Sequence, residues 1–175
     1  MTQRGLAASL IVRNESQTLT TCLASLAGVV DEIHVHDTGS TDGTPELAAG
    51  LGAIVTHGLW RDDFAAARNE ALVGWSSDWV LCIDADEQVV AAVPALRTLL
   101  NDSTGDALLT HIDNVEDTGD HTDRSPRLFR PSMICWEGRV HEQVVGRDRP
   151  LRTELVPREV RRSRFRAPAS PAPSR

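Results

Sequence analysis

Three carboxylates within four residues follow a short apolar run. The segment DWVLCIDADEQVV, residues 78–90, places Asp84, Asp86 and Glu87 directly after the run VLCI. Carboxylates this close at the end of a buried strand repel one another unless a cation compensates their charge. Mg²⁺ and Mn²⁺ prefer oxygen ligands and are often held by one or two carboxylates together with substrate phosphate oxygens. The pattern therefore favours a divalent metal at Asp84 and Asp86, with an acidic solvated turn or helix start as the alternative.

Two further polar clusters follow apolar runs in the same way. Arg13-Asn14-Glu15 follows the first run of the chain, and DTGSTDGT, which begins at Asp37, follows the second. A carboxylate at the end of the second run can accept hydrogen bonds from a nucleotide base or from ribose hydroxyls. The alternative for Asp37 is a well-formed glycine-rich turn that leads into a capped helix.

These clusters belong to a regular alternation of apolar runs with helical periodicity. We expect strands at 6–12, 32–36, 53–56 and 79–83, and helices at 15–26, 44–50 and 62–73. Such alternation predicts an α/β fold with a single open, mostly parallel sheet flanked by helices. Ligands of these sheets bind beyond the carboxyl ends of the strands. The three polar clusters should therefore face one crevice.

Arg68 and Asn69 lie in the third expected helix, within DDFAAARNEAL. The chain has no lysine, so arginine is the available partner for a diphosphate or a base, through its planar set of donors. The alternative is an exposed helix arginine paired with Asp62 or Glu70. The absence of lysine also excludes a Schiff-base lysine and a P-loop lysine.

Length and charge set broad limits on the protein class. The 175 residues fit one domain, and the net charge of −7 argues against non-specific nucleic-acid binding. No apolar segment reaches the roughly 18 residues of a membrane-spanning helix, so we expect no transmembrane segment. The three cysteines are widely separated and indicate buried free thiols in a reducing compartment. We expect a cytoplasmic protein, with peripheral contact to the inner face of the membrane left open.

The second half of the chain has a different pattern. We expect a helix at 93–100, strands at 107–111 and 127–129, and a strand or hairpin within 136–145. The last of these segments contains His141, a candidate site residue whose alternative role is structural. Glu137 and Glu142 beside it are candidate general bases, and the sequence does not exclude Asp113. From 151 to 175 the chain becomes rich in arginine and proline, which predicts a poorly ordered tail after a folded domain at 1–150.

These segments together resemble the family 2 glycosyltransferases, which have a GT-A fold. The likeness rests on four motifs in order, namely SLIVRNES, EIHVHDTGSTDGT, WRDDFAAARNEAL and DWVLCIDADE, and continues through RLFR and WEGRVHEQ. It looks closest to bacterial members that glycosylate peptides, proteins or cell-surface glycans. The resemblance implies a Rossmann-like nucleotide-binding half followed by a shorter mixed half.

The resemblance also implies the activity and the roles of the candidate residues. The reaction would transfer a sugar from a nucleotide-diphosphate donor, a UDP-sugar, to an acceptor hydroxyl with inversion and with the help of Mn²⁺ or Mg²⁺. The acceptor would be a glycan, a peptide or a protein. The residues that would bind the donor are Arg13, Asn14, Glu15, Asp37, Asp42, Arg68, Asn69 and Asp84, with Asp37 and Arg68 at the base. Asp86 and Asp84, joined by His141, would hold the metal, and Glu137 or Glu142 would act as the base.

Three alternatives remain beside this interpretation. Family members usually continue further on the acceptor side, so the chain is expected to be C-terminally truncated and could be an inactive nucleotide-sugar-binding remnant. A haloacid-dehalogenase-type phosphatase would carry Thr or Val two residues after the second Asp, where Gln88 stands. A sugar nucleotidyltransferase would carry a glycine-rich basic loop after the first strand, where the chain has Arg13-Asn14-Glu15.

Overall fold

The first half of the chain forms four parallel strands that are connected by helices. The structure is a computed structural model and describes residues 5–115, 121–156 and 160–165. The elements are β1 (Leu6–Val12), α1 (Leu19–Leu26), β2 (Glu32–Asp37), α2 (Thr44–Gly50), β3 (Ile54–His57), α3 (Phe64–Ala71) and β4 (Trp79–Cys82). The strands lie in the order β3-β2-β1-β4, all parallel. Each expected strand and helix of this half is present.

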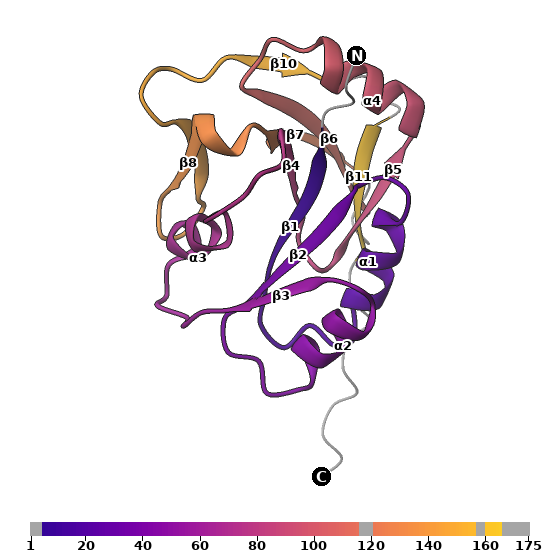
Figure 1. The fold of residues 1–175 in the computed structure, drawn as a ribbon, viewed down its shortest axis with the longest axis vertical. Coiled ribbons are helices and arrows are strands. Elements are labelled where there is room, and N and C mark those ends of the chain that lie inside the picture. The colour runs from indigo at the N-terminus through magenta and orange to yellow at the C-terminus, as the bar shows by residue number, and fades with distance from the viewer. Residues whose placement is uncertain (1–4, 116–120, 157–159, 166–175) are drawn as a thin grey trace.

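Burial explains why these segments form the centre of the sheet. Residues of β1 and β4 are buried along almost their whole length, as expected of parallel strands that are covered on both faces. Alternate residues of β4 enter different clusters: Trp79 and Leu81 pack with α1, α2 and α4, whereas Val80 and Cys82 pack with α3 and the β8–β9 hairpin. The parallel register brings the carboxyl ends of β1, β2 and β4 to one edge of the sheet (Figure 1).

The second half extends the sheet with mixed pairing. Its elements are β5 (Glu87–Ala91), α4 (Val93–Asp102), β6 (Ala107–Val115), β7 (His121–Phe129), the 3₁₀ turn η1 (Pro131–Met133), β8 (Ile134–Glu137), β9 (Gln143–Gly146), β10 (Thr153–Leu155) and β11 (Val160–Phe165). β7 pairs antiparallel with both β4 and β6, while β8 and β9 form a separate hairpin. The prediction of a mostly parallel α/β sheet with a shorter mixed second half is confirmed. β5 was not predicted.

The structure shows strands in part of the segment after residue 150, which was expected to be poorly ordered. β10 pairs with β6, and β11 pairs with β6 and β5. The buried carboxylate of Asp106 holds the start of this segment, because it accepts hydrogen bonds from the guanidinium groups of Arg149 and Arg152 and from the Arg152 backbone. Val156 is fully buried. Residues 157–159 and 166–175 of the expected tail lie outside the described residues.

The helices are short and cover the sheet rather than extend from it. The longest helix among the described residues, α4, has ten residues. Within the described parts of the chain, no helix has the length and apolar character that a bilayer-spanning segment requires.

Candidate active site

The acidic segment after β4 forms a closed turn. The backbone N–H of Glu87 donates to the Asp84 carbonyl at 3.0 Å, and the backbone N–H of Asp84 donates to Glu87 Oε2 at 3.0 Å. The Glu87 side chain is completely buried. A turn with an i to i+3 hydrogen bond at the end of a buried strand holds Asp84 and Asp86 in a fixed backbone geometry.

Two arginines bind the carboxylate of Asp84. Arg68 Nη2 on α3 donates to Asp84 Oδ1 at 2.7 Å, and Arg127 Nη2 on β7 donates to Oδ2 at 3.2 Å. The alternation of β4 places Asp84 on the side of the sheet that α3 covers, where Val80 and Cys82 also point. The negative charge that the sequence left uncompensated is therefore balanced by guanidinium groups from two other elements.

Arg68 is the centre of this arrangement. Its side chain is 5% exposed, and its remaining donors reach Glu142 Oε1 at 2.8 Å and Cys82 Sγ at 3.0 Å. Burial alone would lower the pKa of this guanidinium, but the electrostatic contributions of Cys82 and Asp84 and the bonds to Asp84 and Glu142 outweigh burial and raise it. The arginine is thus held charged inside the protein, between the turn and the β8–β9 hairpin.

The β8–β9 hairpin is fixed to α3 by several contacts. Asn69 makes two hydrogen bonds with the backbone of Trp136, both at 2.9 Å, and the Arg68 guanidinium lies 4.9 Å from the centre of the Trp136 ring. The backbone N–H of Phe64 donates to the Arg139 carbonyl at 3.1 Å. These contacts bring Glu142 into the same cluster as Asp84, although the two residues are far apart in the sequence.

The loops after β1 and β2 are hydrogen-bonded to each other at the edge of the sheet where the Asp84–Glu87 turn also lies. Asn14, which has a left-handed backbone (φ 59°), accepts from the Thr41 N–H at 2.8 Å, and Asp42 accepts from the Ser16 N–H at 3.2 Å. Hydrogen bonds to Asp42, first from Thr44 and then from Ser16, lower its pKa to about 2. These loops contain the predicted donor-binding residues Arg13, Asn14, Glu15 and Asp42.

Asp37 lies in its own turn at the end of β2. The residue is 4% exposed, and its carboxylate accepts from the backbone N–H groups of Gly39 and Ser40. Burial would raise the pKa of Asp37, but hydrogen bonds from Ser40 and Gly39 and the nearby His57 lower it. The structure thus shows the turn-closing role that the sequence offered as the alternative for this residue.

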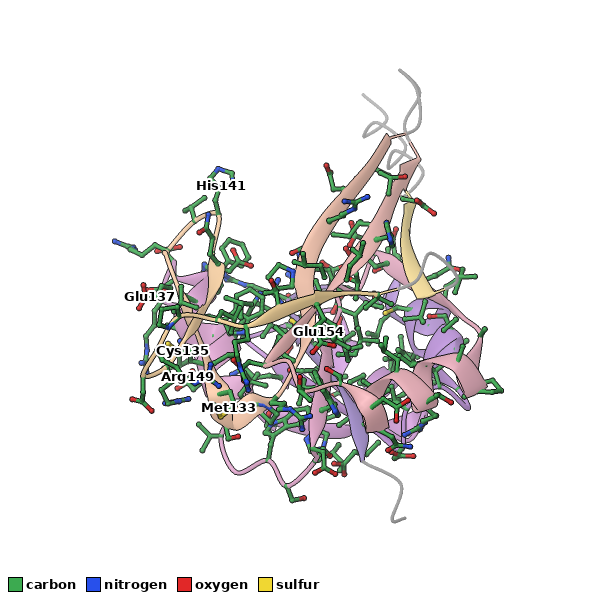
Figure 2. The ribbon with its side chains drawn as sticks, turned by 90° about the horizontal axis from the view of Figure 1, so that it is seen from above. Met133, Cys135, Glu137, His141, Arg149 and Glu154 are labelled. Carbon is green, nitrogen blue, oxygen red and sulfur yellow. The ribbon has the colours of Figure 1, made fainter. Side chains whose placement is uncertain are left out.

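The structure places two of the expected site residues differently from the predictions made for them. Arg68 was expected at a nucleotide base, and the structure instead buries it, with hydrogen bonds from Nε, Nη1 and Nη2 to protein groups. His141 was expected beside Asp84 and Asp86 as a metal ligand. It is exposed at the tip of the hairpin, where the backbone is left-handed (φ 58°) and the side chain points away from the body of the protein (Figure 2).

A preformed three-ligand metal site is therefore absent from the described residues. No group of three or more His, Cys, Asp or Glu side chains in those ranges is placed to hold a metal. Asp84 is a poor ligand because two guanidinium groups already occupy its oxygens and would repel a cation. Asp86, half-buried in the turn, is the carboxylate of the pair that fits a metal whose other ligands are phosphate oxygens.

Arg127 and Trp136 are site residues that the sequence did not predict. Each also has a buried nitrogen without a hydrogen-bond acceptor among the described residues, Arg127 Nη1 and Trp136 Nε1. Both belong to motifs that carry the family likeness, RLFR and WEGRVHEQ, but nothing local in those motifs indicates the contact of Arg127 with Asp84 or of Trp136 with Arg68.

Comparison with known proteins supports the resemblance stated from the sequence. The family model described as Glycosyl transferase family 2 matches residues 9–156. The SPbeta prophage-derived glycosyltransferase SunS of Bacillus subtilis is 29% identical over 150 residues, which cover 81% of this chain and 35% of that protein. A glycosyltransferase of Rickettsia conorii, described as uncharacterized, is 36% identical over 132 residues, 74% of this chain and 46% of that one. The chain spans less than half the length of these relatives.

Solved structures share the fold. The structure of S. aureus TarS 1–349 in complex with UDP-GlcNAc has a TM-score of 0.64 at 16% identity and covers 87% of this chain and 59% of that one. Glucosyl-3-phosphoglycerate synthase from Mycobacterium tuberculosis, in complex with Mn²⁺, UDP and phosphoglyceric acid, has a TM-score of 0.50 at 27% identity, with 66% of this chain and 44% of that one covered. The predicted GT-A fold is confirmed. With its fold, its motifs and a family match over residues 9–156, the chain belongs to glycosyl transferase family 2.

Proposed function

We propose that this chain binds a UDP-sugar at the carboxyl ends of β1, β2 and β4 and is the donor-binding part of an inverting, metal-assisted glycosyltransferase. The observation that carries the proposal is the Asp84–Glu87 turn, which Arg68 and Arg127 hold at the strand ends where α/β sheets bind ligands. The family supports a nucleotide-sugar donor. The Mycobacterium tuberculosis neighbour, whose structure contains UDP and Mn²⁺, supports uridine as the nucleoside.

The proposed donor contacts follow from where each residue lies relative to the ends of β1, β2 and β4. The loops that carry Arg13, Asn14, Glu15 and Asp42 lie beyond β1 and β2, and we assign them to the nucleoside. Asp37 shapes its loop and can use a remaining lone pair for the base. Arg68 and Asn69 support the site from α3 through Asp84 and Trp136.

Asp86 is the proposed ligand of the divalent metal, Mn²⁺ or Mg²⁺, with the diphosphate oxygens completing the coordination. When bound, such a metal supplies electrostatic stabilisation to the departing nucleoside diphosphate. The chain's own contribution is to hold Asp86 in a rigid turn while Arg68 and Arg127 neutralise Asp84, so that the second carboxylate does not compete for the metal.

Glu142 is the proposed general base for the acceptor hydroxyl. It is 13% exposed and is joined to the Asp84 turn by Arg68, whereas Glu137, the other candidate, is exposed at the end of β8. A carboxylate on one side of the sugar would remove the hydroxyl proton while the diphosphate leaves on the other side. This arrangement corresponds to a single displacement with inversion. The proposed acceptor is a glycan, a peptide or a protein that is met in the cytoplasm.

An inactive nucleotide-sugar-binding remnant is the competing function. Both functions require donor binding, and only the first requires turnover.

The test combines binding with turnover. UDP is titrated calorimetrically into the chain with and without MnCl₂, and UDP release from UDP-sugars is then measured. Asp86→Asn should weaken the Mn²⁺-dependent binding at least about tenfold, which corresponds to the loss of about 1.4 kcal/mol. Binding without turnover would favour the remnant, and UDP binding that neither needs Mn²⁺ nor changes in Asp86→Asn would contradict the role of Asp86.

A further inference from the structure

Glu87 is a fully buried carboxylate at the position where the site meets β5. Its exposure is 0%, and glutamate is rarely buried completely unless its oxygens have partners. An apolar side chain of similar volume would avoid the desolvation of a carboxylate, so its presence here calls for a specific role.

The geometry identifies that role as control of the turn. Glu87 contacts Asp84 twice, since its Oε2 accepts the Asp84 N–H and its own N–H donates to the Asp84 carbonyl, each at 3.0 Å. The Cys22 thiol donates to the same carbonyl at 3.5 Å. With both backbone groups of Asp84 bound and its carboxylate held by arginines, the two residues between Asp84 and Glu87 have little freedom. One of those two residues is Asp86.

We propose that Glu87 is a positioning residue of the donor site: through the backbone of Asp84 it fixes the turn that directs Asp86 toward the donor diphosphate. Asp84 then anchors the turn and does not bind the metal. Asp86 is the residue of the pair that contacts the metal and the phosphates. The inference rests on the proposed function, because it assigns Glu87 a purpose only if Asp86 binds the donor.

Three substitutions of Glu87 separate the effect of its hydrogen-bond acceptor from the effects of its charge and its volume. Glu87→Gln keeps an acceptor oxygen at the same reach, Glu87→Asp keeps the charge but withdraws the oxygen by one methylene, and Glu87→Ala removes both. Asp106→Asn is the matched control, because Asp106 is another buried carboxylate whose partners, Arg149 and Arg152, lie at the opposite edge of the sheet from the turn.

The dissociation constant of UDP is measured calorimetrically with MnCl₂, at a temperature well below the thermal unfolding midpoint of every variant. We expect Glu87→Asp and Glu87→Ala to bind UDP about tenfold more weakly, as for the loss of one hydrogen bond that organises a site. Glu87→Gln should stay within about threefold of the wild type. Asp106→Asn should unfold earlier and bind UDP like the wild type.

A double-mutant cycle tests whether Glu87 acts through Asp86. In the Asp86→Asn background, Glu87→Asp should cause no further loss of UDP affinity. Additive losses, or wild-type affinity in both Glu87→Asp and Glu87→Ala, would overturn the inference while leaving the proposed function intact. Absence of UDP binding by the wild type would overturn both.

Discussion

Arg68 Nη2 on α3 lies 2.7 Å from Asp84 Oδ1 at the end of β4. This contact joins a helix of one face of the sheet to the strand end where a ligand of such a fold binds, and Arg127 completes it from β7 at 3.2 Å. Since Arg68 also binds Glu142, a single guanidinium connects the acidic turn with the β8–β9 hairpin. The local structure of the site thus depends on a buried charge network rather than on any one loop.

Replacement of Arg68 distinguishes a buried network from an exposed ligand contact. Arg68→Met should lower the free energy of unfolding by about 3–5 kcal/mol, because Glu142 would lose its cationic partner in a largely buried position and Asp84 would keep the longer contact to Arg127. Arg61→Met is the control, since Arg61 pairs with Glu70 at 3.9 Å and the two side chains are 65% and 41% exposed, so the loss should not exceed about 1 kcal/mol. Urea unfolding measures both values. If Arg68→Met were as stable as the wild type, the buried charge network would be contradicted. Arg68 would then be interpreted again as a residue that contacts the donor.

Asn69 offers a second test of the same kind. Asn69→Ala should destabilise the protein by about 2 kcal/mol, because it removes both hydrogen bonds to the Trp136 backbone. Asn69→Asp should be similarly destabilising, since one carboxylate oxygen would face the Trp136 carbonyl. Thermal unfolding and UDP titration are compared for both variants. Loss of UDP affinity without loss of stability would show that Asn69 binds the donor directly, as the family resemblance implies.

The fold of the first half could be predicted because its signals are local. Buried parallel strands appear as continuous apolar runs, and the spacing of Leu19, Cys22, Leu23 and Leu26 is that of a buried helix face. The order of the segment after residue 150 could not be predicted, because Asp106, which binds Arg149 and Arg152, lies 43 and 46 positions away. An arginine-rich segment without periodicity gives no indication of such a partner.

The convergence of the polar clusters was predictable, and their contacts were not. The clusters after β1, β2 and β4 lie at one edge of the sheet, as the parallel order predicts. Helical spacing could have shown that Arg68 lies on the buried face of α3, since Ala65 and Ala71 are three residues before and after it and are both buried. No comparable signal exists for Arg127, which binds Asp84, or for Trp136, which lies against the Arg68 guanidinium, because both contacts depend on how the second half of the chain returns to the sheet.

His141 is predicted to be dispensable for metal-dependent donor binding. His141→Asn suits the left-handed backbone at this position, because asparagine adopts that conformation readily, and it removes only the imidazole. We expect the dissociation constant of UDP in the presence of Mn²⁺ to stay within about threefold of the wild-type value. Such a change corresponds to less than about 1.4 kcal/mol of binding free energy. Asp86→Asn serves as the positive control in the same titration. A loss in His141→Asn as large as in Asp86→Asn would mean that the hairpin closes over the donor and brings His141 to the metal.

Asp106 should make the stability of the protein depend on pH in the acid range. Hydrogen bonds from Arg149, and to a smaller extent from Arg152, hold the pKa of Asp106 in the folded protein well below its ordinary value of 3.8. When the pKa of a carboxyl group is lower in the folded than in the unfolded protein, the group stabilises the fold fully at pH values above its unfolded-state pKa. This stabilisation is lost as the pH falls toward its folded-state pKa. At about pH 7, Asp106→Asn should be less stable by about 1–2 kcal/mol, the low end for charged hydrogen bonds, because both arginines are partly exposed. The difference in urea midpoint between wild type and variant should narrow below pH 3.8, and a constant difference would contradict this account.

Glu142 and Glu137 can be separated by their amide variants. In Glu142→Gln the side-chain oxygen can still accept from Arg68 Nε, so the unfolding free energy and the dissociation constant of UDP should remain close to those of the wild type. Turnover, followed as transfer or hydrolysis of a UDP-sugar, should fall by about 10²–10⁴, the usual contribution of a general base. Glu137→Gln, at an exposed position at the end of the same hairpin, should retain turnover. If the two variants show the reverse order, Glu142 acts only as the partner of Arg68, and the base is the carboxylate of Glu137.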